Sequence, residues 1–253
     1  MLGLTVCSAP SRTPGVRIKQ DGLSDAITCF AVALQQLKNP LHAPPVHSIS
    51  MLRCAITNRT LFPGDDAHQQ AALVRQTALW AQQGIDLIQL REKDLPAAAL
   101  ATLARRILQA VEGTTTRLLI NSRPDVALAV AAHGVHLTSA PGELTPTQVR
   151  QLFQQSGAGK PAITISCHTI SSILTAKNHQ PDAILFSPIF EKNIADKTIP
   201  GQGLARLHEA CQAAAPIPIY ALGGITQTNS TQCQEAGATG IAAIRLFHQT
   251  LSQ

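Results

Sequence analysis

The stretches IPIYALGGIT, at Ile217–Thr226, and GIAAIR, at Gly240–Arg245, decide the fold. Each begins as a short apolar run rich in β-branched and small residues, which is typical of a buried strand. The polar segment between them, Thr226–Glu235, is of helical length and composition. The order strand, helix, strand predicts two parallel neighbouring strands joined by a crossover helix.

The same alternation continues back to Met51. Predicted strands lie at Leu52–Thr57, Asp86–Arg91, Arg117–Ile120, Gly134–Leu137, Ala162–Ser166, Ala183–Phe186, Ile217–Leu222 and Gly240–Ile244. Predicted helices lie at Ala67–Gln83, Pro96–Val111, Pro124–Ala131, Thr145–Gln154, Ser171–Asn178, Gly203–Ala214, Thr226–Glu235 and from Arg245 onward. Eight such units predict a closed (β/α)8 TIM barrel over residues 51–253. A doubly wound open sheet is the alternative, and the barrel is favoured because the count stops at eight.

The composition excludes several classes of protein. Of 253 residues, 45% are hydrophobic and 14% charged, which excludes a chain disordered throughout. The net charge of +5 is dispersed without aromatic stacking positions, so we expect no nucleic-acid partner. No apolar run approaches the roughly 18 residues of a membrane span. The six cysteines show neither a C-x-x-C pair nor metal-ligand spacing, which favours free thiols and a cytoplasmic location. Whether the chain forms a homo-oligomer stays an open question.

The first 50 residues differ from the rest. They contain scattered proline and serine, show no strand-helix alternation and fit a signal peptide poorly. One amphipathic helix over Ala26–Leu37 is compatible with the pattern. We expect residues 1–50 to be an extension, either disordered or preceding the true start of translation at Met51.

Functional groups of a barrel gather at the C-terminal ends of its strands. The second predicted strand ends in QLREK, where a period of two places Gln89, Arg91 and Lys93 on one face. An amide, a planar guanidinium and an ammonium suit a phosphate ligand. The alternative is an internal ion pair with Glu92 or Asp94.

The last two strands suggest a second anion site. Gly223 and Gly224 allow backbone N–H groups to approach a ligand, and Thr226 is the expected cap of a following helix. A helix start at Arg245 beside it would complete the phosphate cup found after the last two strands of many barrels. The Arg245 side chain either adds a charge there or lies on a solvated helix face.

Two further strand ends carry polar groups. His168, in SCHT, is either a general acid/base or a capping residue, and the two readings stay even. The long polar loop from Ser187 to Gly203 is compatible with a lid over the mouth. His133 and His136 lack a third ligand in sequence, which argues against zinc.

These strand ends resemble one family, thiamine phosphate synthase and its TenI-type thiazole tautomerase relatives. The resemblance covers nearly all of Met51–Phe247. Its motifs are QLREK (Gln89–Lys93), LLINSRPDVAL (Leu118–Leu128), HGVHL (His133–Leu137), SCHT (Ser166–Thr169), SPIF (Ser187–Phe190), GQGL (Gly201–Leu204) and ALGGIT (Ala221–Thr226).

The resemblance implies a reaction and a site. A hydroxymethylpyrimidine diphosphate and a hydroxyethylthiazole phosphate would join, with Mg²⁺ and loss of pyrophosphate. Gln89, Arg91, Lys93 and Asn121 would face the pyrimidine diphosphate, and Ser166 would lie near the reacting centre. The thiazole phosphate would bind backbone N–H groups of Gly223, Gly224, Ile244 and Arg245.

The sequence departs from the family pattern where the metal is expected. Ser122 and Pro141 replace two metal-binding aspartates, Glu143 is the next carboxylate, and the loop after the sixth strand keeps only Lys192 and Lys197 as cations. Three functions therefore stay open. They are a synthase with a rearranged metal site around Glu143, which is the function we expect, a tautomerase using His168 or a water as proton shuttle, and a non-catalytic binder of thiazole phosphate or thiamine phosphate.

Overall fold

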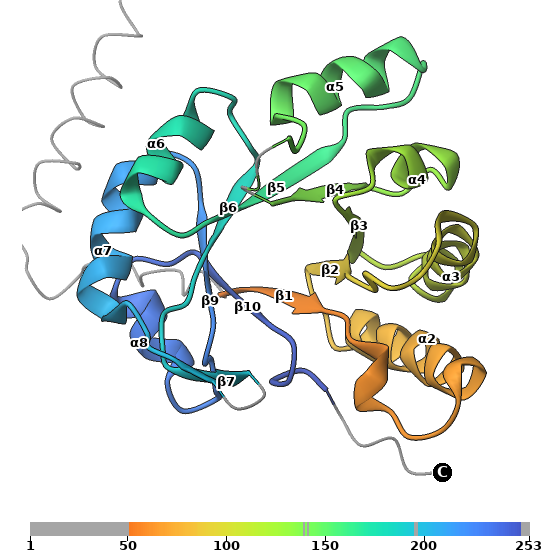
Figure 1. Ribbon diagram of the computed structural model, residues 1–253, viewed down its shortest axis with the longest axis horizontal. Helices are drawn as coiled ribbons and strands as arrows, with labels where there is room; N and C mark the ends of the chain where they lie inside the picture. Colours follow the sequence, from red (N-terminus) through yellow and green to blue (C-terminus); the bar gives the residue numbers. More distant parts are fainter. Residues whose placement is uncertain (1–50, 139, 141, 195–196, 249–253) are drawn as a thin grey trace, which may run out of the picture. The chain divides into compact units, whose positions relative to one another are not determined.

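The computed structural model describes residues 51–138, 140, 142–194 and 197–248, without the side chains of 193, 194 and 197. The predicted extension at residues 1–50 and its helix lie outside these residues. Eight parallel strands close into a barrel in the order β1-β10-β9-β6-β5-β4-β3-β2, and helices surround them (Figure 1). The TIM barrel prediction is confirmed, and the open-sheet alternative is wrong.

The elements follow the predicted alternation closely. The barrel strands are β1 (Leu52–Ile56), β2 (Leu87–Leu90), β3 (Arg117–Asn121), β4 (Gly134–Leu137), β5 (Ala162–Cys167), β6 (Ala183–Phe186), β9 (Ile219–Leu222) and β10 (Gly240–Ala243). The helices are η1 (Arg59–Leu61), α2 (Asp66–Gln82), α3 (Ala97–Ala110), α4 (Pro124–Ala129), α5 (Pro146–Gln155), α6 (Ile170–Lys177), α7 (Gly203–Ala214) and α8 (Ser230–Glu235).

The alternation of side chains along each strand creates two layers of packing. One set packs outward against the helices, for example Ile88, Ile120 and Val135, all fully buried. The other set faces the barrel interior. Here the four strands β1, β6, β9 and β10 contribute one apolar cluster, which we call the apolar half: Cys54, Ile56, Ala183, Leu185, Tyr220 and Ala242.

The remaining strands, β2 to β5, place polar side chains in the interior toward their C-terminal ends. We call this the polar half: Gln89, Asn121, His136, Thr164 and Ser166. Gln89 bonds to Asn121, and His136 bonds to Thr164 and Ser166, so each member contacts another across neighbouring strands. The barrel is therefore divided lengthwise into an apolar wall and a polar wall.

Two predicted helix starts are wrong. Thr226 does not cap α8, because residues 226–229 form a turn in which Thr226 N donates to Asn229 Oδ1 over 2.8 Å. Asn229 also donates to the Gly224 carbonyl, and this local bonding competes with the helix, which begins only at Ser230. After β10, residues 244–247 form bends and a turn, and no helix begins at Arg245 as predicted.

The chain after β10 is tied to α2. The Trp80 indole Nε1 donates to the Phe247 carbonyl over 2.7 Å, and the rings of Phe62 and His248 lie 4.6 Å apart. These contacts use a carbonyl that a helix starting at Arg245 would direct along its own axis.

The segment after β6 is more ordered than a polar loop. It contains an antiparallel hairpin of β7 (Lys192–Ile194) and β8 (Lys197–Ile199). The Lys197 side chain lies outside the described residues. Cys54, Cys167, Cys211 and Cys233 are free thiols, and none of the described helices is long and apolar enough to cross a bilayer.

Candidate active site

The polar half opens at the ends of β2 and β3. The Gln89 side chain, 2% exposed, donates from Nε2 to Asn121 Oδ1 over 2.8 Å. Its carbonyl oxygen Oε1 is buried and has no hydrogen-bond partner among the described residues. A buried acceptor without a donor costs about 1–3 kcal/mol, so this atom is suited to receive an N–H group from a ligand.

Arg91 and Lys93 follow Gln89, and neither side chain forms an ion pair or hydrogen bond among the described residues. The predicted alternative, pairing with Glu92 or Asp94, is wrong, because Arg59 binds both carboxylates. Arg59 Nη1 lies 3.0 Å from Glu92 Oε2 and 2.7 Å from Asp94 Oδ1. Arg91 and Lys93 therefore have no acidic partner among the described residues.

Arg59 and its three carboxylate partners, Asp66, Glu92 and Asp94, form a cluster that holds the segment after β2 in place. We call it the Arg59 cluster. Arg59 is 5% exposed and also bonds to Asp66 through Nε at 2.7 Å. Hydrogen bonding to Arg59 lowers the pKa of Asp94 to about 2, so its carboxylate stays ionised at neutral pH. Thr57 connects the cluster to the site, donating to Glu92 Oε1 and accepting from the Arg91 backbone N–H.

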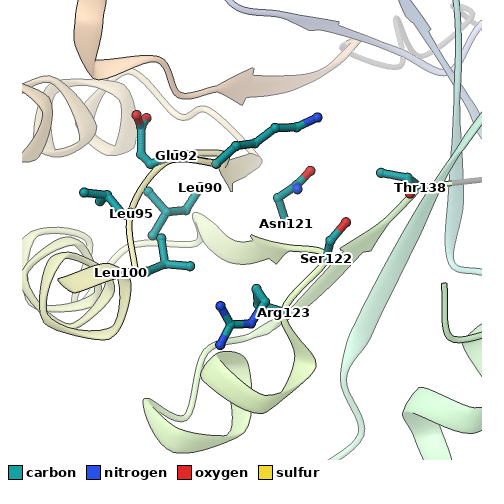
Figure 2. A pocket seen from close by; sticks show the side chains of 9 residues that line it. Leu90, Glu92, Leu95, Leu100, Asn121, Ser122, Arg123 and Thr138 are labelled. Atoms are coloured by element: carbon teal, nitrogen blue, oxygen red, sulfur yellow. The ribbon is translucent and has the colours of Figure 1, made fainter. Parts of the chain in front are cut away.

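A cavity of about 340 Å³ lies at the ends of β2, β3 and β4 (Figure 2). Leucines form its apolar side, and polar groups from the ends of β2, β3 and β4 form the other. In Figure 2 the Glu92 carboxylate points away from Asn121 and Ser122. The lining residues are Leu90, Glu92, Lys93, Leu95, Leu100, Asn121, Ser122, Arg123 and Thr138.

Ser122 is held by a carboxylate from the following loop. Its hydroxyl donates to Glu143 Oε2 over 3.0 Å, and Thr138 Oγ1 donates to the same oxygen over 2.6 Å. Ser122 also has a φ of 52°, the left-handed region that non-glycine residues rarely adopt. Glu143 thus lies against the residue that replaces the first expected aspartate, while Pro141 lies outside the described residues.

The side chains around Ser122 and Glu143 offer few of the oxygen ligands that Mg²⁺ prefers. Among residues 51–248 as described, no group of three or more His, Cys, Asp or Glu side chains is placed to hold a metal ion. Glu143 is a single carboxylate whose Oε2 already accepts two hydroxyl groups. The described residues therefore do not fit the two-carboxylate magnesium site that the resemblance implies.

The deepest polar group of the site is His136, which is 2% exposed. Its Nδ1 lies 2.8 Å from Thr164 Oγ1, and its Nε2 lies 2.9 Å from Ser166 Oγ. Burial and the positive charge of Arg91 lower its pKa to about 3. The sequence pointed to no role for His136 beyond a rejected zinc site, although its place as a polar residue at an inward position of GVHL was a signal that could have identified it.

His168 lies at the end of β5 and contacts β6. Its Nδ1 is 2.9 Å from the Ser187 carbonyl oxygen, to which Gln202 Nε2 also donates over 2.8 Å. Because a carbonyl only accepts, Nδ1 carries a proton and donates it to Ser187. His168 is therefore anchored by one nitrogen and has the other for a proton transfer or a ligand.

Gly223 and Gly224 have a packing role that the sequence did not reveal. Both have positive φ, 98° and 67°, and a Cβ would lie 2.8 Å from Pro188 and 2.6 Å from the Glu191 carbonyl. Phe190 N donates to the Gly223 carbonyl over 3.0 Å. The two glycines thus admit the segment after β6. Ile244 is half-buried and Arg245 exposed, and no helix begins beside them among the described residues.

Comparison with known proteins decides the family. A family model described as thiamine monophosphate synthase matches residues 54–247. This range includes all eight barrel strands except Leu52 and Arg53, the first two residues of β1. The chain belongs to the thiamine monophosphate synthase family.

Individual family members agree with this. The thiamine-phosphate synthase of Methanoculleus marisnigri is 34% identical over 166 residues, covering 66% of this chain and 75% of the relative. That of Shouchella clausii is 33% identical over 190 residues, covering 75% and 85%. A solved thiamine phosphate pyrophosphorylase from Pyrococcus furiosus superposes with a TM-score of 0.63 at 24% identity, covering 77% of this chain and 85% of that chain, which supports the fold.

Proposed function

We propose that the protein is a thiamine phosphate synthase that acts in the cytoplasm. It joins hydroxymethylpyrimidine diphosphate to hydroxyethylthiazole phosphate. The observation that carries the proposal is the pair of cations Arg91 and Lys93, left unpaired at the mouth because Arg59 binds their acidic neighbours. The relatives named thiamine-phosphate synthase support the reaction, and the free thiols suit a reducing compartment.

The polar half would bind the pyrimidine diphosphate. The amino group of the pyrimidine is a donor that matches the unpaired Gln89 Oε1, with Asn121 beside it. Arg91 and Lys93 would bind the diphosphate oxygens, Arg91 as a fork and Lys93 as a point charge. Ser166, at the end of β5, would lie near the methylene carbon that reacts.

The reaction needs a good leaving group more than it needs a base. The lone pair of the thiazole nitrogen forms the new C–N bond to the pyrimidine methylene, and the C–O bond breaks with its electron pair leaving on pyrophosphate. Lys93 and Arg91 would stabilise the charge that develops on the departing oxygen. No proton has to be removed for this step.

The thiazole phosphate would bind at the ends of β9 and β10. Backbone N–H groups of Gly223, Gly224, Ile244 and Arg245 are the proposed donors, and Lys197 is a proposed cation in the hairpin after β6. His168 would be positioned between the two subsites, because its Nδ1 is engaged by the Ser187 carbonyl. These roles are assigned to side chains and backbone groups alone, because the described residues do not form the two-carboxylate magnesium site that the resemblance implies.

The test is turnover by the purified full chain. Two parallel reactions each contain both substrates, one with Mg²⁺ and the other with a chelator. Thiamine phosphate and pyrophosphate are measured in each. We expect the two products in equal amounts, and a loss of both in Arg91→Met. Absence of product in both reactions, with thiazole phosphate still bound, would reject the synthase and favour the non-catalytic binder. Conversion of a thiazole tautomer abolished in His168→Ala would favour the tautomerase.

A further inference from the structure

His136 forms a hydrogen-bonded chain across the inside of the barrel. It links Thr164, one layer below the mouth on β5, to Ser166, the next inward residue of the same strand. Thr164 is 3% exposed and His136 2%, whereas Ser166 is half-buried and reaches the open end of the barrel. This series of hydrogen bonds therefore runs from the buried interior of the barrel to the place where a ligand would bind.

The direction of the hydrogen bonds depends on the charge of the imidazole. Burial of the His136 ring disfavours the imidazolium, and so does the positive charge of Arg91, the titratable group that acts on it among the described residues. A neutral imidazole has one N–H donor and one acceptor nitrogen. One of the two hydroxyl groups thus donates to His136, and the other accepts from it.

The burial of Thr164 decides which of the two hydroxyl groups donates to His136. The Thr164 hydroxyl is buried, and among the described residues its only hydrogen-bond partner is His136 Nδ1. If Nδ1 carried the proton, the Thr164 hydroxyl would accept it and its own proton would be left buried without an acceptor, which costs free energy. Thr164 therefore donates to Nδ1, and the imidazole proton is on Nε2.

We propose that His136 is a positioning residue whose Nε2–H donates to Ser166 Oγ and leaves the Ser166 hydroxyl proton free to donate to the substrate. The identity of that substrate, the pyrimidine diphosphate, rests on the proposed function. Among the described residues the Ser166 hydroxyl has no other partner, so its proton is available at the mouth. A hydroxyl that accepts one hydrogen bond is a stronger donor in the next, so the chain polarises Ser166 toward an acceptor atom of the ligand.

The opposite arrangement would give the site different chemistry. With the proton on Nδ1, Ser166 would donate into the barrel wall and offer the ligand only lone pairs. Lone pairs beside a diphosphate would repel its oxygens, and the hydroxyl would not assist the leaving group. The tautomer of His136 therefore determines whether Ser166 helps or opposes an anionic substrate.

The first test does not depend on activity. Nitrogen NMR of the full chain labelled at histidine reports which ring nitrogen carries the proton, and the spectrum of His136→Gln assigns the His136 signals by their disappearance. We expect the neutral Nε2–H tautomer throughout pH 5–8. A neutral Nδ1–H tautomer, or protonation of His136 within this range, would overturn the proposal.

Matched variants test the consequence. His136→Gln keeps an N–H donor at the Nε2 position, whereas His136→Leu removes it. We expect kcat to fall at least tenfold in His136→Leu with a smaller change in KM, to recover largely in His136→Gln, and to fall no further when Ser166→Ala is added to His136→Leu. Equal kcat in the Leu and Gln variants, measured per folded protein, would contradict the role.

The two tests separate this inference from the proposed function. If the wild-type chain forms no thiamine phosphate, the proposed function fails, while the NMR spectrum still decides the direction of the hydrogen bonds. In that case binding of the pyrimidine diphosphate replaces kcat as the readout, with the same order expected among the variants. Identical binding by the wild-type, Leu and Gln proteins would overturn the proposal.

Discussion

The two halves of the barrel interior are built on the same alternation of inward and outward side chains, yet they differ in chemistry. The apolar half fills its interior with side chains such as Ile56, Leu185 and Tyr220, all nearly or fully buried. The polar half places amides, hydroxyls and an imidazole at equivalent positions, and leaves one buried acceptor, Gln89 Oε1, without a donor. Polar groups inside a barrel cost free energy unless they are hydrogen-bonded. We therefore expect the apolar half to contribute mainly to stability and the polar half mainly to ligand binding.

The largest expected effect is the loss of the support for the polar half. Arg59→Ala leaves Glu92, whose side chain is 2% exposed, as an uncompensated buried charge, and we expect the free energy of unfolding to fall by about 3–5 kcal/mol. Urea denaturation measures this. Arg123→Ala is the matched control, because it breaks the exposed pair with Asp125, worth about 0–1 kcal/mol. Equal losses in the two variants would mean that the Arg59 cluster is no stronger than a surface pair.

A cavity in the apolar half is expected to reduce stability without reducing affinity. Leu185 is fully buried, so Leu185→Ala removes packed methyl groups and should lower the free energy of unfolding by about 2–5 kcal/mol. The dissociation constant for the pyrimidine diphosphate, measured by calorimetry below the unfolding temperature, should stay within about twofold. A large loss of affinity in this variant would erase the distinction between the halves.

The ligand cations should show the opposite behaviour. Arg91→Met is expected to weaken binding of the pyrimidine diphosphate by about 1.5–3 kcal/mol, the range for hydrogen bonds to charged groups, with little change in stability. Arg245→Met, at the mouth of the apolar half, is the control and should change this affinity by less than about 0.5 kcal/mol, because that arginine is exposed and its proposed contact is through the backbone. Unchanged affinity in Arg91→Met would remove Arg91 from the site.

The effect expected to be smallest at neutral pH is a pH dependence of stability from His136. In the unfolded chain its pKa is near 6.5, and in the folded chain about 3, so below pH 6.5 the unfolded state binds a proton that the native state does not. The free energy of unfolding is thus unaffected by this group above pH 6.5 and falls by up to about 1.4 kcal/mol per pH unit as the pH drops toward 3.

Denaturation at pH 7 and pH 5 checks this slope. His136→Gln should have a shallower slope than the wild type, and His208→Gln, which changes an exposed histidine, should keep it. If both variants behave alike, His136 does not stay neutral inside the barrel.

Local patterns were sufficient to predict the fold and part of the polar half. Short apolar runs alternating with helical segments predicted all eight barrel strands, because each strand is buried on both faces. The position of Gln89 and Asn121 at adjacent strand ends follows from the same alternation. Where a side chain bonds locally to the backbone, as Asn229 does to Gly224, the pattern failed, and the predicted helix start at Thr226 was wrong.

The rest depends on contacts between residues distant in the chain. Arg59 meets Glu92 across 33 positions, and His136 meets Ser166 across 30, so neither pairing has a local signature. Glu143 bonds to Ser122 through a loop whose path no periodicity predicts. The contacts of Arg59 with Glu92 and Asp94 are the ones that leave Arg91 and Lys93 without an acidic partner, which is why sequence alone kept the internal ion pair as an alternative.

The most direct measurement is a crystal structure of the full chain with the pyrimidine diphosphate bound. The account predicts the pyrimidine amino group within hydrogen-bond distance of Gln89 Oε1, and the diphosphate on Arg91 and Lys93. A diphosphate bound only at the ends of β9 and β10, with Gln89 Oε1 still unpaired, would contradict the assignment of the polar half as the substrate site.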